Sequence, residues 1–118
     1  MDNQKILLAI ASSDGIVVNS HFGRAGKFYI YEVCDENVSF MEVREVEPVC
    51  NGGNHEEDKL ERNMQIISDC QYLLVSRIGN GATLVAERFD IEPYEIPGEI
   101  MDSIEQLVKF IKIKRLFQ

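Results

Sequence analysis

The sequence predicts an α/β fold built around a mixed sheet of five or six strands with about three helices. Segments rich in β-branched and aromatic residues fill the chain before Pro48, and strand-like segments alternate with helical ones after it. The first pattern favours antiparallel pairing, whereas strand–helix–strand order requires some parallel pairing. Apolar residues make up 45% of 118 residues, which suits one hydrophobic core, so residues 1–118 are expected to form a single domain.

The expected strands are recognised by apolar runs and by β-branched content. The first run, KILLAIA, is typical of a strand covered on both faces. A turn at residues 35–37 joins the next long strand to a hairpin partner, whose imperfect alternation indicates a bulge or an edge position. Pro93 restricts the last strand to an edge. The expected strands cover residues 5–11, 16–18, 27–34, 38–47, 71–76 and 91–96.

Three helices are expected from apolar spacing and from charge near the helix ends. Leu60, Met64 and Ile67 recur at the spacing of one helix face. Acidic residues lie in the first turn of that segment, and Lys and Arg residues lie in the last turns of the C-terminal one, as the helix dipole favours. The expected helices cover residues 56–68, 79–88 and 98–115.

Charge and composition exclude several classes of function. A net charge of −8 and a pI near 4.7 oppose binding to nucleic acid. No apolar run approaches the ~20 residues that span a bilayer, and the N-terminal stretch is better interpreted as a strand than as a signal peptide. Three cysteines without regular spacing argue against a disulfide scaffold and favour a reducing, cytoplasmic setting.

The loop at residues 19–25, NSHFGRA, is the first candidate for a functional site. His21 follows a short strand and lies beside a glycine-containing turn, where an imidazole can reach solvent. Histidine is the commonest metal ligand among side chains. The alternative interpretation is a surface histidine that bonds nearby backbone.

The segment VCNGGNH is the second candidate. Cys50 and His55 carry a thiol and an imidazole on a loop whose two glycines let the backbone close around a ligand, and both groups suit iron–sulfur clusters, zinc or copper. The alternative is a connector in which both residues are incidental. Cys34 and Cys70 lie next to strands in apolar surroundings, so we interpret them as small buried hydrophobic residues.

Other chemistries have weaker support. Gly79 and Gly81 match half of a dinucleotide-binding motif, but Leu84 occupies the third glycine position, which favours a simple helix start. No serine lies in a nucleophile elbow. Asp14 and the acidic residues at 42–47 are candidates for holding a divalent cation in a hydrolase, although a solvated strand face explains most of them.

The motif N-x-H-F-G at Asn19–Gly23 resembles the dinitrogenase iron–molybdenum cofactor biosynthesis family. That family includes small nitrogenase cofactor carriers and the C-terminal domain of the radical enzyme that builds the cofactor precursor. A Cys-x-Gly-Gly segment at Cys50 and a Ser-Asp-Cys segment at residues 68–70 are also similar. The resemblance extends from about residue 5 to residue 110.

The resemblance implies a ribonuclease H-like fold without ribonuclease activity. It implies a non-enzymatic carrier that binds an iron–sulfur precursor cluster or the iron–molybdenum cofactor and exchanges it with cluster-donor and cluster-acceptor proteins. His21 and Cys50 would be the metal ligands, with Asn19 and His55 as further cofactor-binding residues. Arg24 stands where the family often has a second histidine, which removes a ligand but adds a cation for an anionic cluster.

The acidic chain can bind such a cluster only if positive charge gathers near His21, and Arg24, Lys27 and Arg77 are its expected sources. Two other functions stay open. One is a metal-free interaction or regulatory domain whose acidic surface binds a basic partner. The other is a hydrolase, which requires several carboxylates around a divalent ion.

Overall fold

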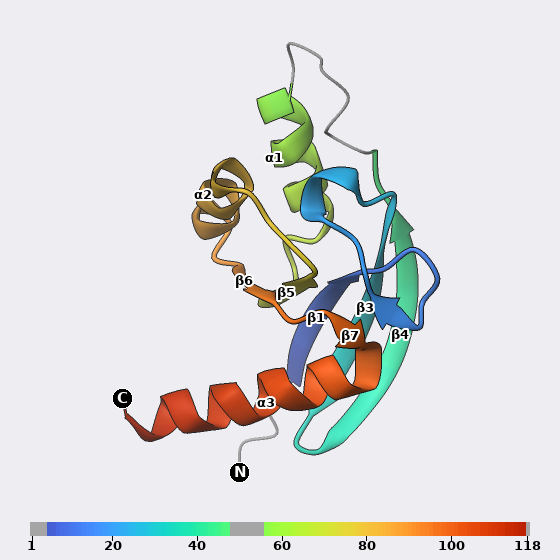
Figure 1. The fold of residues 1–118 in the computed structure, drawn as a ribbon. Helices are drawn as coiled ribbons and strands as arrows, with labels where there is room; N and C mark the ends of the chain where they lie inside the picture. The colour runs from blue at the N-terminus through green and yellow to red at the C-terminus, as the bar shows by residue number, and fades with distance from the viewer. Residues whose placement is uncertain (1–4, 48–55, 118) are drawn as a thin grey trace.

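The computed structural model describes residues 5–47 and 56–117. A central sheet separates two layers of helices (Figure 1): α1 and α2 pack on one face, and α3 crosses the other. The strands are β1 (Lys5–Ala11), β2 (Val17–Val18), β3 (Lys27–Cys34), β4 (Asn37–Glu45), β5 (Tyr72–Val75), β6 (Glu92–Glu95) and β7 (Gly98–Glu99). The helices are α1 (Glu56–Ile66), α2 (Asn80–Arg88) and α3 (Ile100–Leu116), with a short 3-10 helix η1 (Phe22–Arg24).

The main sheet has five strands in the order β4-β3-β1-β5-β6. β3 runs antiparallel to both β1 and β4, whereas β5 is parallel to β1 and β6 is parallel to β5. This mixed sheet, with antiparallel pairing first and parallel crossovers later, confirms the predicted fold class. One antiparallel strand within an otherwise parallel set is the arrangement of the ribonuclease H-like folds.

The central strand is covered on both faces, as its apolar run predicts. Ala9 and Ala11 belong to the core under α1 and α2, and Leu8 and Ile10 belong to the core under α3. All four side chains are at most 1% exposed. β1 therefore gives the loop that follows its carboxyl end a rigid starting point.

A second, two-stranded sheet was not predicted. β2 pairs with β7, and the Ile100 N–H donates to the Ile16 carbonyl at 2.9 Å. The sequence assigns Gly98 and Glu99 to the start of the last helix, which is wrong because these residues form β7 and the helix begins at Ile100. Two-residue strands are too short to show a periodic pattern.

The edges of the main sheet match the expectations. β4 is an edge strand, and its pairing with β3 shifts register between Ile30 and Tyr31, so the expected bulge is present. β6, which contains Pro93, forms the other edge. Arg44 of β4 donates to both carboxylate oxygens of Asp69, at 2.7 and 3.0 Å, and so ties this edge to the turn before β5.

The carboxyl ends of the parallel strands meet at one edge of the sheet. β1 ends at Ala11, β5 at Val75 and β6 at Glu95, and the strand register places these residues at the same end. In open α/β sheets this edge is where ligands bind. No helix among the described residues is long and apolar enough to cross a membrane.

Candidate functional site

His21 lies at the carboxyl edge of the sheet, where residues 20–22 extend the parallel pairing beyond β5. His21 forms a parallel bridge with Arg77. The Ser76 N–H donates to the Ser20 carbonyl at 3.0 Å, and the Phe22 N–H donates to the Arg77 carbonyl at 2.9 Å. The His21 side chain is exposed. The hydrogen-bonded backbone therefore holds the imidazole on an accessible part of this edge. We call this part, which consists of residues 20–24 and Arg77, the rim.

Phe22 is the anchor that orients this rim. Its side chain is 1% exposed, and its ring centroid lies 5.6 Å from that of Phe28 in the core under α1 and α2. His21 has an extended backbone, with φ −73° and ψ 145°. Successive side chains of an extended segment point to opposite sides. Burial of Phe22 therefore turns His21 outward.

Asn19 holds the loop that leads to His21. Its Oδ1 accepts from the Ser13 N–H at 3.0 Å, and its Nδ2 donates to the Ser13 Oγ at 3.0 Å. Both ends of the amide are thus used within the loop. Direct binding of a cofactor by Asn19 stays a prediction, and the observed contacts are those of a positioning residue.

Asp14 also stabilises the loop that leads to His21. Its Oδ1 accepts from the N–H groups of Ile16 and Val17, at 2.9 and 3.1 Å. These hydrogen bonds lower the pKa of Asp14, because they stabilise the charged carboxylate. Within residues 5–47 and 56–117, no three His, Cys, Asp or Glu residues group in a way that could hold a metal ion. The acidic cluster that a hydrolase would need is thus missing from this part of the chain.

Two of the three expected cations lie next to His21 along the backbone. Arg77 is its bridge partner, and the Arg24 N–H donates to the His21 carbonyl at 3.0 Å. Both arginines are exposed, and neither forms an ion pair with a described carboxylate. Lys27 lies elsewhere, with its Nζ 5.9 Å from the centroid of the Tyr29 ring, which packs on the α3 side of the sheet.

The N-terminus of α2 follows Arg77 at the same edge. Gly79 caps this helix without a side-chain hydrogen bond. Just before it, the Ile78 N–H donates to the Glu95 Oε2 at 2.9 Å, so one carboxylate lies close to the positive end of the helix dipole. The Ser76 Oγ is buried and has no hydrogen-bond partner among the described residues. Sequence reasoning missed Ser76 and the bridge between His21 and Arg77, since neither leaves a periodic or spacing signal.

Two of the three cysteines lie among the described residues, whereas the second histidine does not. Cys50 and His55 lie outside the described residues, so their relation to His21 stays a prediction. Cys34 is partly buried and pairs with Lys5, at the opposite end of the sheet from His21. Cys70 is 2% exposed, which confirms its interpretation as a buried residue. Cys34 and Cys70 are both free thiols.

Cys70 should resist alkylation while the protein is folded. Burial raises the pKa of its thiol to about 12, so the reactive thiolate is scarce at pH 8. We expect iodoacetamide to label Cys70 at least about tenfold more slowly in buffer than in urea, as measured by peptide mass spectrometry. Equal rates in the two conditions would contradict the buried position.

These features define a class of domain: a ribonuclease H-like sheet whose carboxyl edge presents a histidine and two arginines in the described part of the chain. A sequence model of the dinitrogenase iron–molybdenum cofactor family matches residues 4–110. The chain belongs to this family, as the N-x-H-F-G motif indicates.

Similar proteins support this assignment. The FeMo cofactor biosynthesis protein NifB of Frankia alni is 42% identical over 94 residues, which are 77% of this chain and 18% of that protein. Protein NifY of Klebsiella pneumoniae is 27% identical over 113 residues, which are 95% of this chain and 48% of that protein. The chain thus spans less than half the length of either relative.

A solved structure supports the fold. A putative NifB protein from Thermotoga, determined by NMR, superimposes with a TM-score of 0.64 at 23% identity and 88% coverage of both chains. At this identity the likeness concerns the fold alone.

Proposed function

We propose that this protein is a non-enzymatic carrier of an iron–sulfur metallocluster, either the iron–molybdenum cofactor or its precursor. The observation that carries the proposal is the exposed imidazole of His21, fixed by the bridge to Arg77 and by the buried ring of Phe22. Membership in the iron–molybdenum cofactor family supports the identity of the cargo. The similarity to NifB, a FeMo cofactor biosynthesis protein, supports a place in cofactor assembly.

The surroundings of His21 suit an anionic guest on an acidic protein. Arg77 and Arg24 add positive charge beside the imidazole. The N-terminus of α2 adds its dipole, which the Glu95 carboxylate on the Ile78 N–H offsets in part. A cargo that must be released needs few protein ligands, because a closed four-ligand site holds its metal tightly. An open rim with one or two ligands fits transfer better than permanent storage.

Each predicted residue has a role in this proposal. His21 is the principal ligand, Cys50 is the second ligand, and Arg24 is the charge partner of the cluster. Asn19 keeps the loop in shape, and His55 is a further cofactor-binding residue. The roles of Cys50 and His55 rest on residue chemistry and on the family resemblance.

The proposal extends to partners and setting. A carrier requires a protein that donates the cluster and a protein that accepts it, and an exposed rim allows both to approach. Thiolate ligation and the free thiols of Cys34 and Cys70 fit the reducing cytoplasm. The family match over residues 4–110 supports treating residues 1–118 as one domain.

The test is anaerobic cluster binding. Apo-protein is mixed with isolated iron–sulfur precursor cluster, passed over a gel-filtration column, and analysed for iron content and visible absorption. We expect the wild-type protein to retain the cluster and His21→Ala to bind it at least about tenfold more weakly. Asn37→Ala, an exposed change at the opposite end of the sheet, serves as the control.

Two results would reject the carrier function. One is failure of the folded wild-type protein to retain any cluster, which would leave the metal-free interaction domain as the better account. The other is equal retention by the wild-type protein and His21→Ala, which would move the site away from the rim.

A further inference from the structure

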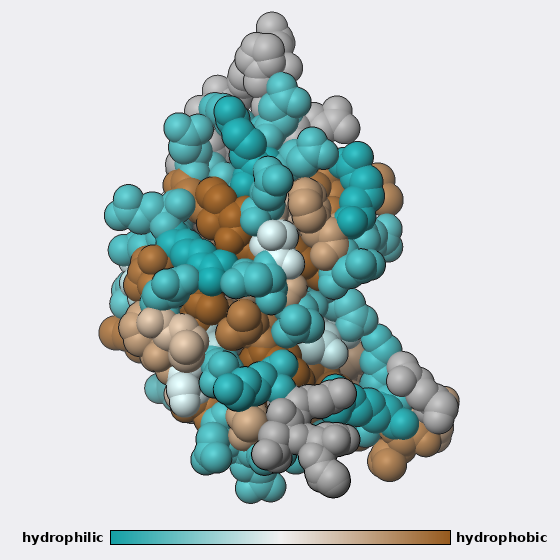
Figure 2. All heavy atoms as spheres, turned by 180° about the vertical axis from the view of Figure 1, so that it is seen from behind, coloured by the Kyte–Doolittle hydropathy of each residue, from teal (hydrophilic) through white to brown (hydrophobic). Residues whose placement is uncertain are grey.

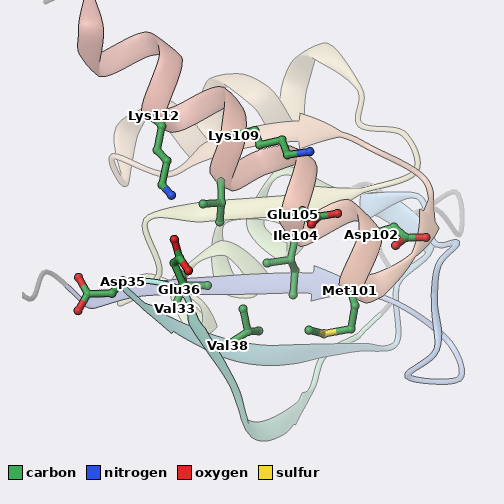
Figure 3. A pocket seen from close by; sticks show the side chains of 11 residues that line it. Val33, Asp35, Glu36, Val38, Met101, Asp102, Ile104, Glu105, Lys109 and Lys112 are labelled. Carbon is green, nitrogen blue, oxygen red and sulfur yellow. The ribbon is translucent and has the colours of Figure 1, made fainter.

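A cleft of about 570 Å³ separates α3 from the β3–β4 hairpin (Figure 3). Its floor is apolar, where Val33 and Val38 from the strands face Ile104 and Met101 from α3. The cleft lies on the α3 side of the sheet, near the hairpin turn, whereas His21 lies at the other end. It is therefore separate from the rim described above.

Apolar residues beside this cleft are exposed to solvent. Met101 is 50% exposed and Phe40 is 53% exposed. Phe40 lies on the α3 face of the sheet, because its ring centroid is 5.5 Å from that of Tyr31. Figure 2 shows hydrophobic side chains gathered along the edge that β4 forms, with a second group at the free end of α3. An apolar helix surface of another molecule would cover this area.

α3 itself has the charge pattern of a self-complementary helix. Asp102 and Glu105 lie in its first half, and no acidic residue follows Glu105. Its second half is basic and contains Lys109, Lys112, Lys114 and Arg115. Two such helices side by side attract each other when antiparallel and repel each other when parallel.

One stripe of α3 combines this charge pattern with apolar residues. Helical spacing places Met101, Glu105, Val108, Lys112 and Leu116 on one face. Four of them line the cleft, and Leu116 continues the stripe with 79% of its side chain exposed. Neither Glu105 nor Lys112 forms an ion pair with a described residue. Along the helix, the stripe is apolar, acidic, apolar, basic and apolar. When a second copy runs antiparallel, its basic residue lies opposite the acidic one and its apolar residues lie opposite apolar ones.

We infer that the occupant of this cleft is α3 of a second copy of the chain, packed antiparallel about a twofold axis near Val108. Glu105 then faces Lys112 of the second copy, and symmetry repeats this pair. Met101 faces Leu116 of the second copy at each end. A twofold interface requires a self-complementary surface, which this stripe provides. Each helix also lies over the exposed face of the other copy's β4, and both His21 rims stay free.

Charge reversal tests the interface. Sedimentation velocity over a range of concentrations compares the wild-type protein with Glu105→Lys, Lys112→Glu and the double variant that carries both changes. We expect a wild-type dimer, and we expect each single variant to weaken the dimer at least about tenfold, because like charges then face each other. The double variant should restore the dimer, since the attraction is re-formed with the signs exchanged.

Glu87→Lys and Arg88→Glu are the matched controls. They make the same changes in net charge on α2, which packs on the opposite face of the sheet, and should leave the dimer unchanged. Circular dichroism shows whether each variant is folded. A wild-type protein that stays monomeric at every concentration would overturn the inference. So would a dimer that both single reversals leave intact, or a double variant that stays monomeric although folded.

Discussion

Replacing Phe22 with alanine is expected to lower the free energy of unfolding by about 3–5 kcal/mol, the usual range for a buried phenylalanine. The ring is 1% exposed and packs against Phe28 and its neighbours under α1 and α2. Truncation leaves a cavity where the loop is anchored to the core. Urea denaturation measures the effect.

Phe117→Ala is the matched control, because the same ring is 84% exposed there. It should change the free energy of unfolding by less than about 0.5 kcal/mol, as surface substitutions do. Equal losses in the two variants would show that Phe22 does not anchor the rim.

Reversing the charge of both arginines at the rim is expected to weaken cluster binding strongly. Arg24→Glu together with Arg77→Glu should weaken binding of an anionic cluster by about a hundredfold, roughly tenfold for each position. Both side chains are exposed, so the fold should tolerate the changes. The measurement is a titration of apo-protein with cluster, followed by visible absorption at two salt concentrations.

Salt gives this experiment a second readout. Wild-type affinity should fall as salt rises, whereas the affinity of the double variant should rise with salt, because salt screens the repulsion between the two glutamates and the anionic cluster. Arg88→Glu, which changes charge at the far end of α2, should bind the cluster like the wild-type protein. Affinity unchanged in the double rim variant would contradict an electrostatic role for Arg24 and Arg77.

The fold could be predicted where apolar patterns are long. The run at residues 5–11 and the strand at 27–34 match β1 and β3, because both are long enough to show their burial pattern. The hairpin partner was expected to reach residue 47, whereas β4 ends at Glu45. The β2–β7 pair escaped prediction because it is made by backbone hydrogen bonds between segments far apart in the chain.

The candidate site could be predicted in part for a similar reason. The motif at residues 19–23 singles out His21, and the structure holds that residue on an exposed rim. The position of Arg77 beside it depends on a parallel bridge that no local pattern encodes. Lys27 was expected near His21 but packs over Tyr29, since strand alternation sends its side chain toward the α3 face.

A carrier of this kind requires a bond between the imidazole of His21 and the bound cluster, and this bond can be measured. Protein labelled with nitrogen-15 histidine is loaded anaerobically with a cluster in a paramagnetic state, and pulsed electron paramagnetic resonance measures the hyperfine coupling to nitrogen. The chain has two histidines, so His21→Ala and His55→Ala identify the source. We expect a directly coupled histidine nitrogen in the wild-type protein that disappears in His21→Ala. A loaded wild-type protein without this coupling, or a coupling that persists in His21→Ala, would contradict this expectation.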